Sequence, residues 1–231
     1  MSFTKIYIFS VAAIGLSLLS LSSGAIAQTA VVAGSLTIIP APSSLAQDQT
    51  QSDTTAVGFF EKKGYTLGSP LTVSAISPGL YDQNSDFPSV SPRLAGFWEV
   101  ASFIIHADSI TNAVGGGGRV FNGSVTFDMP ILGIIVNGNR LVNSDAILGT
   151  PLVTYENSGI GRGMEFNPSG QDTLEWTGNT ITFHFVEFPA TLDEVRIVVF
   201  SVPEPGQIST LGSMAIAGGF FALRRRRAVK K

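Results

Sequence analysis

The chain has 231 residues, no cysteine and a formal net charge of −3. The missing cysteines exclude disulfides, thiol catalysis and cysteine-based metal sites. Its charges are unevenly spread: six of the 14 basic residues stand in the last eight positions, while residues 28–202 hold seven basic and 16 acidic residues, a net of −9. This acidic body argues against nucleic-acid binding, because phosphates require a basic surface.

The first 27 residues have the layout of a secretory signal. Lys5 is their only charge, residues 6–21 are apolar, and Ala25 and Ala27 frame a small-residue cleavage site. A permanent anchor is the alternative, but the apolar stretch is short against the roughly 20 residues that a bilayer span needs. The sequence therefore predicts export, cleavage after Ala27 and a mature chain that begins at Gln28.

Residues 28–201 are predicted to form one extracellular all-β domain, a β-sandwich or a jelly-roll-like fold. Short apolar runs alternate with segments rich in Gly, Asn, Asp, Ser and Pro, a pattern typical of such folds. No internal stretch shows sustained helical periodicity. The expected strands are residues 35–39, 56–61, 71–76, 97–107, 119–128, 131–136, 140–142, 152–155, 173–176, 181–188 and 194–200.

Tight turns are predicted at three dipeptides, Gly178-Asn179, Asn137-Gly138 and Asn122-Gly123. In the first hairpin Thr177 should face Thr180, which places Glu175 opposite Thr182. The residues expected in the core are Phe97, Val100, Phe103, Ile105, Phe127, Trp176, Phe183, Phe185, Ile197 and Val199.

The end of the chain, residues 202–231, contains three parts in order. Residues 202–205 read VPEP, and the two prolines favour a rigid, extended break. Residues 208–223 carry no charge, and as a helix they would be about 24 Å long, against a hydrocarbon core of about 30 Å. Residues 224–231 are basic, and their four adjacent arginines would hold the C-terminus in the cytoplasm. The three parts predict a short transmembrane segment, for which an ordinary tail anchor is the alternative.

This ending closely resembles the PEP-CTERM sorting signal of bacteria that make extracellular polysaccharide. The resemblance implies processing by an exosortase, a membrane enzyme that acts near the Pro-Glu-Pro motif. It also implies a precursor in the inner membrane and a mature protein at the cell surface or in the extracellular matrix. The processing motif would be Pro203, Glu204 and Pro205, and the stop-transfer residues would be Arg224, Arg225, Arg226 and Arg227.

The body itself is similar to a group of uncharacterised exported bacterial proteins. The likeness runs through VGFFEKKGYTL, GSVTFDMPILGIIV, ILGTPLVTYENSGIGRGMEF and TGNTITFHF. It implies a shared β fold and no particular chemistry.

Catalytic motifs are not found in the sequence. His106 and His184 are the only histidines, and each is expected on the polar face of a strand without a special role. The chain lacks a G-x-S-x-G elbow and an H-E-x-x-H motif. Residues 159–163 read as a turn, because the glycine spacing of a nucleotide loop is missing. Glu175 and Glu187 share a predicted hairpin but are not expected to form a glycosidase pair.

Residues 82–86, DQNSD, resemble the first half of a calcium loop. Asp82, Asn84 and Asp86 supply alternate oxygen ligands, but Phe87 replaces the turn glycine and Arg93 replaces the bidentate glutamate. An Asx-turn loop is the favoured interpretation. A calcium site that uses these three residues and more distant ligands stays open, and no other metal or cofactor is expected.

These observations predict a non-enzymatic surface or matrix protein with a structural or polysaccharide-associated role. One alternative is a lectin-like module in which Trp98, Trp176, Tyr81 or Tyr155 stacks on sugar rings. The other is a secreted polysaccharide hydrolase or lyase, which would need two carboxylates in a concave groove.

Overall fold

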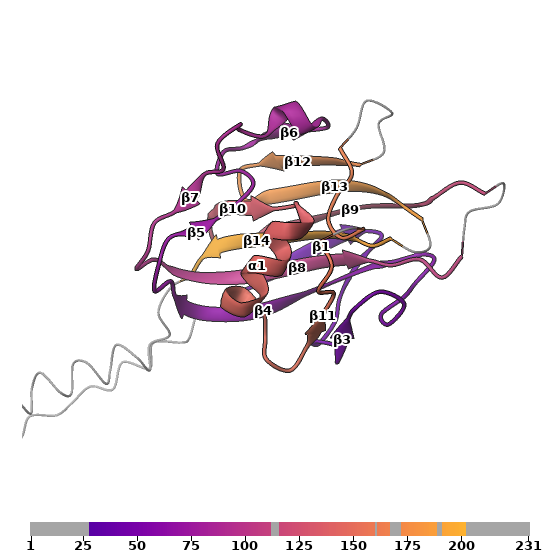
Figure 1. Cartoon of the computed structure of the whole chain (residues 1–231), viewed down its shortest axis with the longest axis horizontal. Coiled ribbons are helices and arrows are strands. Elements are labelled where there is room, and N and C mark those ends of the chain that lie inside the picture. The colour runs from indigo at the N-terminus through magenta and orange to yellow at the C-terminus, as the bar shows by residue number, and fades with distance from the viewer. Residues whose placement is uncertain (1–27, 112–115, 160, 167–171, 189–190, 202–231) are drawn as a thin grey trace, which may run out of the picture.

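The computed structural model describes residues 28–111, 116–159, 161–166, 172–188 and 191–201, and strands dominate these segments (Figure 1). The predicted signal peptide, with Ala25 and Ala27, and the predicted sorting signal lie outside the described residues. Within the described segments, every helix is too short or too polar to cross a membrane.

The first five-stranded sheet is antiparallel throughout and has the strand order β1-β9-β13-β12-β6. Its strands are β1 (Ala30–Gly34), β9 (Arg119–Phe127), β13 (Thr180–Glu187), β12 (Thr173–Thr177) and β6 (Gly79–Tyr81). The predicted hairpin at Gly178-Asn179 is confirmed, because Thr177 pairs with Thr180 and Glu175 with Thr182. The predicted turn at Asn122-Gly123 is wrong, since both residues lie inside β9 and pair with β13.

The second five-stranded sheet has the order β10-β14-β8-β4-β2 and is antiparallel except where β2 joins β4. Its strands are β10 (Ile131–Ile135), β14 (Asp193–Phe200), β8 (Glu99–Ala107), β4 (Ala56–Thr66) and β2 (Leu36–Ile38). The short elements are β3 (Ser44–Leu45) with β11 (Thr154–Tyr155), β5 (Leu71–Thr72) with β7 (Arg93–Leu94), and the 3-10 helix η1 (Asn84–Asp86).

The two sheets pack face to face as a β-sandwich, and the main core lies between them. Alternate residues of each strand point into this layer, as the period of two requires. Phe183 and Phe185 of β13 meet Phe103 and Ile197 of the second sheet in the same buried cluster. Nine of the ten predicted core residues are buried. The exception is Phe97, which is 85% exposed, so its assignment to the core is wrong.

The helix α1 (Gly138–Leu148) corrects the predicted hairpin at Asn137-Gly138 and the predicted strand at residues 140–142. Asn137 begins the helix, because its side chain accepts a hydrogen bond from the Arg140 backbone N–H. Leu141 and Leu148, seven residues apart, bury one helical face. Figure 1 shows α1 across β14 and β8, on the side of the second sheet that faces away from the first. The helix therefore gives this sheet a second buried face.

Candidate metal centre

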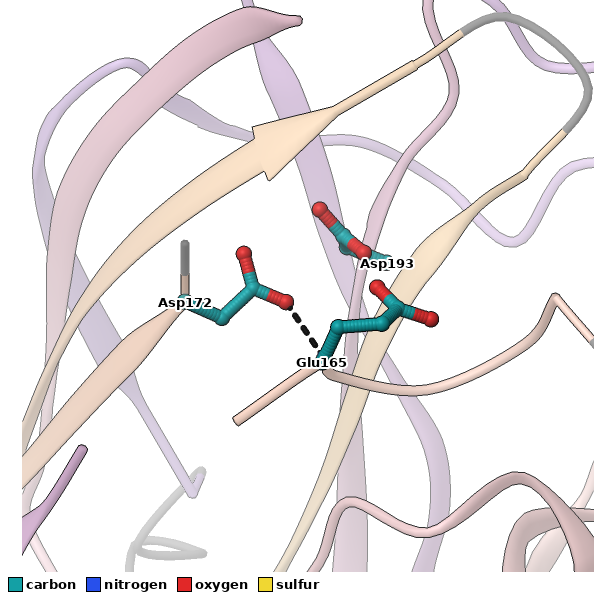
Figure 2. Close-up of side chains that lie close together, drawn as sticks. All are labelled: Glu165, Asp172 and Asp193. Carbon is teal, nitrogen blue, oxygen red and sulfur yellow. Dashed lines mark hydrogen bonds between the residues drawn. The ribbon is translucent and has the colours of Figure 1, made fainter. Parts of the chain in front are cut away.

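Three carboxyl groups from separate parts of the chain meet at one end of the sandwich (Figure 2). Glu165, Asp172 and Asp193 each offer an oxygen atom, and these three atoms lie within 4.8 Å of one another. Asp172 and Asp193 are completely buried, whereas Glu165 is exposed. The cluster therefore has two members in the interior and one toward solvent.

The two buried members belong to different sheets. Asp172 directly precedes β12 of the first sheet, and Asp193 is the first residue of β14 in the second. Asp193 pairs with Ala107 of the main core, so its side chain points into the layer between the sheets. A ligand held by both carboxylates would join the two sheets.

Backbone contacts bring Glu165 to the same place. The N–H groups of Leu192 and Glu194 donate to the carbonyls of Gly161 and Gly163, at 2.9 and 3.3 Å, and align residues 161–166 with the start of β14. Gly163 has a φ of +109°, and a Cβ there would collide with the Val136 carbonyl oxygen. The position therefore requires glycine.

Asp193 is the least compensated member of the cluster. Both of its carboxylate oxygens are buried, and neither has a hydrogen-bond partner among the described residues. Burial, followed by the negative charges of Asp172 and Glu165, raises its pKa well above the ordinary value. An ionised carboxylate in this setting lacks the cation or donors that normally offset its desolvation.

The other two members are held by backbone hydrogen bonds. The Asp172 carboxylate accepts from the Glu165 N–H at 2.7 Å and from the Val186 N–H at 2.9 Å. Burial raises the pKa of Asp172, and partial desolvation by the surrounding protein, followed by the charge of Asp172, raises that of Glu165. Water screens Glu165 more than its partners, because its side chain is exposed. The two bonds hold one oxygen each, so both oxygens of Asp172 are fixed in place.

Further acidic side chains deepen the negative potential. Glu187, at the end of β13, accepts a hydrogen bond from the Ser109 N–H at 2.7 Å, while its second oxygen is buried without a partner among the described residues. Burial is the main cause that raises the pKa of Glu187 to about 7. Burial also raises the pKa of nearby Asp108.

The chemistry of this donor set suits a hard cation. Carboxylate oxygens are the ligands that Ca²⁺ and Mg²⁺ prefer, and Ca²⁺ accepts six to eight oxygens in irregular geometry. Glu165, Asp172 and Asp193 would hold the ion, and water or backbone carbonyls would complete its shell. The ion would supply positive charge to a buried group, Asp193, that has no cationic partner among the described residues.

The opposite face of β14 holds a second group of buried charges, which we call the arginine network. The Glu194 carboxylate accepts a hydrogen bond from Arg162 Nε at 2.6 Å and lies 2.9 Å from Nδ1 of His106. Arg196 binds Glu61 through two nitrogens and also contacts Asp145 of α1, at 2.8 Å. Here each carboxylate faces a guanidinium group, so the network ties α1 to the sheet.

The histidines differ from expectation in one case. His106 is buried in the arginine network, so its predicted place on a polar strand face is wrong. The face of β8 that carries His106 is covered by the segment 161–166, whose Arg162 binds Glu194, and by α1 farther along the sheet. His184 lies on the outer face of the first sheet and contacts the Asn122 side chain at 2.6 Å.

Asp82, Asn84 and Asp86, the residues of the predicted calcium loop, are neighbours in the structure, but the side chains of Asn84 and Asp86 bind backbone groups. The Asp86 carboxylate accepts from the backbone N–H groups of Asp82 and Gln83, and the Asn84 amide donates to the Phe166 carbonyl. Within the described segments, the acidic cluster that could hold a metal does not include them. Asp86 closes the 3-10 helix η1 and reaches back to the residues before it, which differs from the predicted Asx turn, and calcium at this loop stays a prediction.

The aromatic residues considered for sugar stacking are mostly inside. Trp176 and Tyr81 are buried core residues, and Tyr155 packs beside Arg162 and Arg196. Trp98 is 41% exposed and is the one of the four that offers an open ring. Glu175 and Glu187 do not pair: Glu175 faces Thr182, and Glu187 faces Arg119.

Sequence reasoning missed the acidic cluster. A signal was present, because extending the alternation of Val195, Ile197 and Val199 backwards places Asp193 on the core face. Comparison with protein families, with curated proteins and with solved structures finds no match. The candidate site therefore depends on its own geometry.

Proposed function

We propose that this chain is an exported, non-enzymatic surface protein whose β-sandwich binds Ca²⁺ as a clamp between its two sheets. The observation that carries the proposal is Asp193, a fully buried carboxylate without a donor among the described residues, with an oxygen of each of two further carboxylates within 4.8 Å. The carboxylate ligands would be Glu165, Asp172 and Asp193.

A bound cation would stabilise an exported domain that has no disulfide bonds. Exported domains often rely on disulfides, and this chain has no cysteine. Calcium is abundant outside cells, and extracellular sites bind it with dissociation constants of about 10⁻⁴–10⁻³ M. A ligand at ten times its dissociation constant stabilises the folded state by about 1.4 kcal/mol.

The export route is part of the same proposal. The predicted signal peptide delivers residues 28–201 to the outside, and the PEP-CTERM-like tail holds the precursor in the inner membrane for an exosortase. After processing, the protein would reside at the surface or in the polysaccharide matrix, with a structural or polysaccharide-associated role.

Two other functions remain alternatives. A lectin-like module would use Trp98, since the other three candidate rings are buried or packed in the protein. A polysaccharide hydrolase or lyase would need a carboxylate open to substrate, whereas Asp172 and Asp193 are completely buried. The burial favours ion binding over acid–base catalysis on a polymer.

Thermal unfolding of the purified protein in Ca²⁺ and in EDTA tests the clamp. Wild type should melt several degrees higher in Ca²⁺, because about 1 kcal/mol corresponds to about 2–4 °C for a domain of this size. Asp193→Asn should remove this gain while raising the melting temperature in EDTA, since a neutral amide avoids the cost of burying or protonating the carboxylate. Asp86→Asn is the matched control and should keep the full response. A wild-type melting temperature that ignores Ca²⁺ would refute the clamp.

Cell fractionation tests the sorting route. Replacing Arg224, Arg225, Arg226 and Arg227 with uncharged residues should release unprocessed protein, because moving each charge outward opposes about 2.3 kcal/mol per 100 mV. Replacing Pro203, Glu204 and Pro205 with alanine should leave unprocessed protein in the membrane. Normal maturation of both variants would contradict the sorting proposal.

A further inference from the structure

Two aromatic side chains are displayed on the surface by a strained turn. Phe97 is 85% exposed and Trp98 is 41% exposed. Phe97 has a φ of +68°, a conformation that a bulky L-residue rarely adopts. The Phe97 N–H donates to Leu67 at 2.6 Å, and the Leu67 N–H donates back to Trp98 at 2.9 Å, so the turn is fixed. Strain held in place around exposed apolar rings is a sign of a contact surface.

This turn lies at the end of the sandwich where the described chain stops. The N–H of Ser201, the last described residue, donates to the Glu99 carbonyl at 3.0 Å, and Glu99 directly follows Trp98. Phe200 is 38% exposed and pairs with Val100. Gln28, the predicted mature N-terminus, also donates to the Phe200 carbonyl. The exposed rings therefore surround the point where the predicted tail begins.

We propose that Phe97 and Trp98 insert into the headgroup region of the membrane that anchors the precursor. This inference rests on the proposed function, because it needs the tail to enter the bilayer. Seven backbone steps separate Ser201 from Ile208, the start of the apolar run, and they span at most about 25 Å. The tail would therefore keep Ser201 within that distance of the apolar core, and the Ser201 N–H is bonded to Glu99, the residue after Trp98.

The chemistry of the surface matches a membrane interface. Trp concentrates at the headgroup level, where its ring is apolar and its N–H can meet water. Lys63 is exposed, and its neighbour Gly64 donates to the Ser201 hydroxyl, which places a cation beside the tail. Cations near the surface attract anionic lipids. Two rings and one lysine bind weakly alone, but a tether raises their effective concentration at the bilayer.

The two tryptophans make the contact directly measurable. Trp98 is exposed and Trp176 is buried, so Trp176→Phe leaves a reporter of the contact and Trp98→Phe leaves a matched control. The full chain is reconstituted into vesicles of phosphatidylcholine and phosphatidylglycerol with bromine near the top of the acyl chains. Emission from Trp98 should fall about twofold and shift to the blue, because bromine quenches rings at the interface. Emission from Trp176 should not change.

A second variant tests whether Phe97 contributes to the membrane contact or only to the fold. Phe97→Gly should relieve the strain of the positive φ at this position and raise the urea midpoint of unfolding. It should also weaken the quenching of Trp98, because one of the two inserted rings is gone. Unchanged quenching of Trp98 in Phe97→Gly would exclude Phe97 from the membrane contact.

Each other outcome has a definite meaning. Failure of the full chain to float with vesicles refutes the membrane tail and this contact with it. Flotation without quenching of Trp98 refutes the contact and leaves the tail proposal standing. A Trp98 response to soluble polysaccharide but not to vesicles also refutes the contact, and it would favour the lectin-like alternative.

Discussion

Asp193 and Glu194 are adjacent residues of β14, both completely buried, yet their surroundings are opposite. Successive side chains of a strand point to opposite faces, so Asp193 faces the layer between the sheets and Glu194 faces the arginine network. Glu194 meets Arg162 and His106, whereas Asp193 meets the carboxyl groups of Glu165 and Asp172.

The pKa values of the two groups express this difference. Burial raises the pKa of Glu194, but the charge of Arg162 and the hydrogen bond to His106 outweigh it and bring the pKa below its ordinary value. Burial and neighbouring negative charges together raise the pKa of Asp193. Two carboxylates with the same burial therefore differ in one respect, the presence of a positive partner. The face of β14 with Asp193 therefore carries buried negative groups without a positive partner among the described residues.

The largest expected loss of stability comes from removing a guanidinium group from the arginine network. Arg196→Met should lower the free energy of unfolding by about 3–5 kcal/mol, because Glu61 would lose its buried partner and Asp145 would lose one of two. Urea denaturation measures this loss. Arg119→Met is the matched control, since Arg119 pairs with Asp53 in a partly exposed bridge worth less than about 1 kcal/mol. Equal losses in the two variants would contradict the account of the network.

A substitution at Gly163 should weaken both the arginine network and the acidic cluster, which lie on opposite faces of β14. Gly163 stands between Arg162 of the network and the segment that carries Glu165, and its φ and close contact with Val136 exclude a side chain. Gly163→Ala should therefore cost about 2–3 kcal/mol of stability and lower the affinity for Ca²⁺. Urea denaturation in EDTA and calcium titration measure the two effects. Loss of stability with unchanged calcium affinity would show that the two faces are not joined through this segment.

The pH dependence should reveal the uncompensated face. The pKa of Glu187 is about 7 in the folded protein, against an ordinary value of 4.5, and that of Asp193 is also raised. The folded chain then holds protons that the unfolded chain has released, so stability falls as pH rises. In EDTA the decline from about pH 5 to 8 should be about 2 kcal/mol.

Glu194 acts in the opposite direction, because its pKa is lowered in the folded state. Its contribution is present above its unfolded pKa and is lost as pH falls through the folded one, so stability should also decline in strong acid. Denaturation curves across this range should show a maximum in mild acid. Glu187→Gln should flatten the alkaline limb, and a stability that climbs steadily to pH 8 in EDTA would refute the assignment.

The smallest effect concerns the exposed member of the cluster. Glu165→Gln should lower the affinity for Ca²⁺ about tenfold, or about 1.4 kcal/mol, because one charged ligand is lost. The urea midpoint in EDTA should rise slightly, since the substitution removes one of the negative charges beside Asp193. Glu175→Gln, on the outer face of the first sheet, is the control and should leave the affinity intact. Equal affinity in the two variants would exclude Glu165 from the ligand set.

Much of the fold could be predicted from local patterns. Alternation over residues 173–188 and the Gly-Asn turn fixed the β12–β13 hairpin and its register. The helix α1 was missed because its sequence, with Asn137 and Gly138 after an apolar run, also satisfies a hairpin pattern. Only the packing of Leu141 and Leu148 against the second sheet separates the two outcomes. Phe97 was misplaced because a positive φ turns it away from the core that its strand pattern implied.

The candidate site could not be predicted as a cluster. Glu165, Asp172 and Asp193 lie in three segments whose approach depends on long-range pairing, such as the bond from Leu192 to Gly161. The alternation of β14 could place Asp193 in the core, but it could not say which charges would meet it. Arg196 shows the same limit, since it reads as an exposed residue until α1 covers it.

Isothermal titration of the wild type and of Asp193→Asn with Ca²⁺ tests the central claim most directly. The wild type should bind one Ca²⁺ per chain with a dissociation constant of about 10⁻⁴–10⁻³ M, and Asp193→Asn should lose this binding while Asp86→Asn retains it. No binding by the wild type, or equal binding by Asp193→Asn, would contradict the claim that Asp193 is a Ca²⁺ ligand.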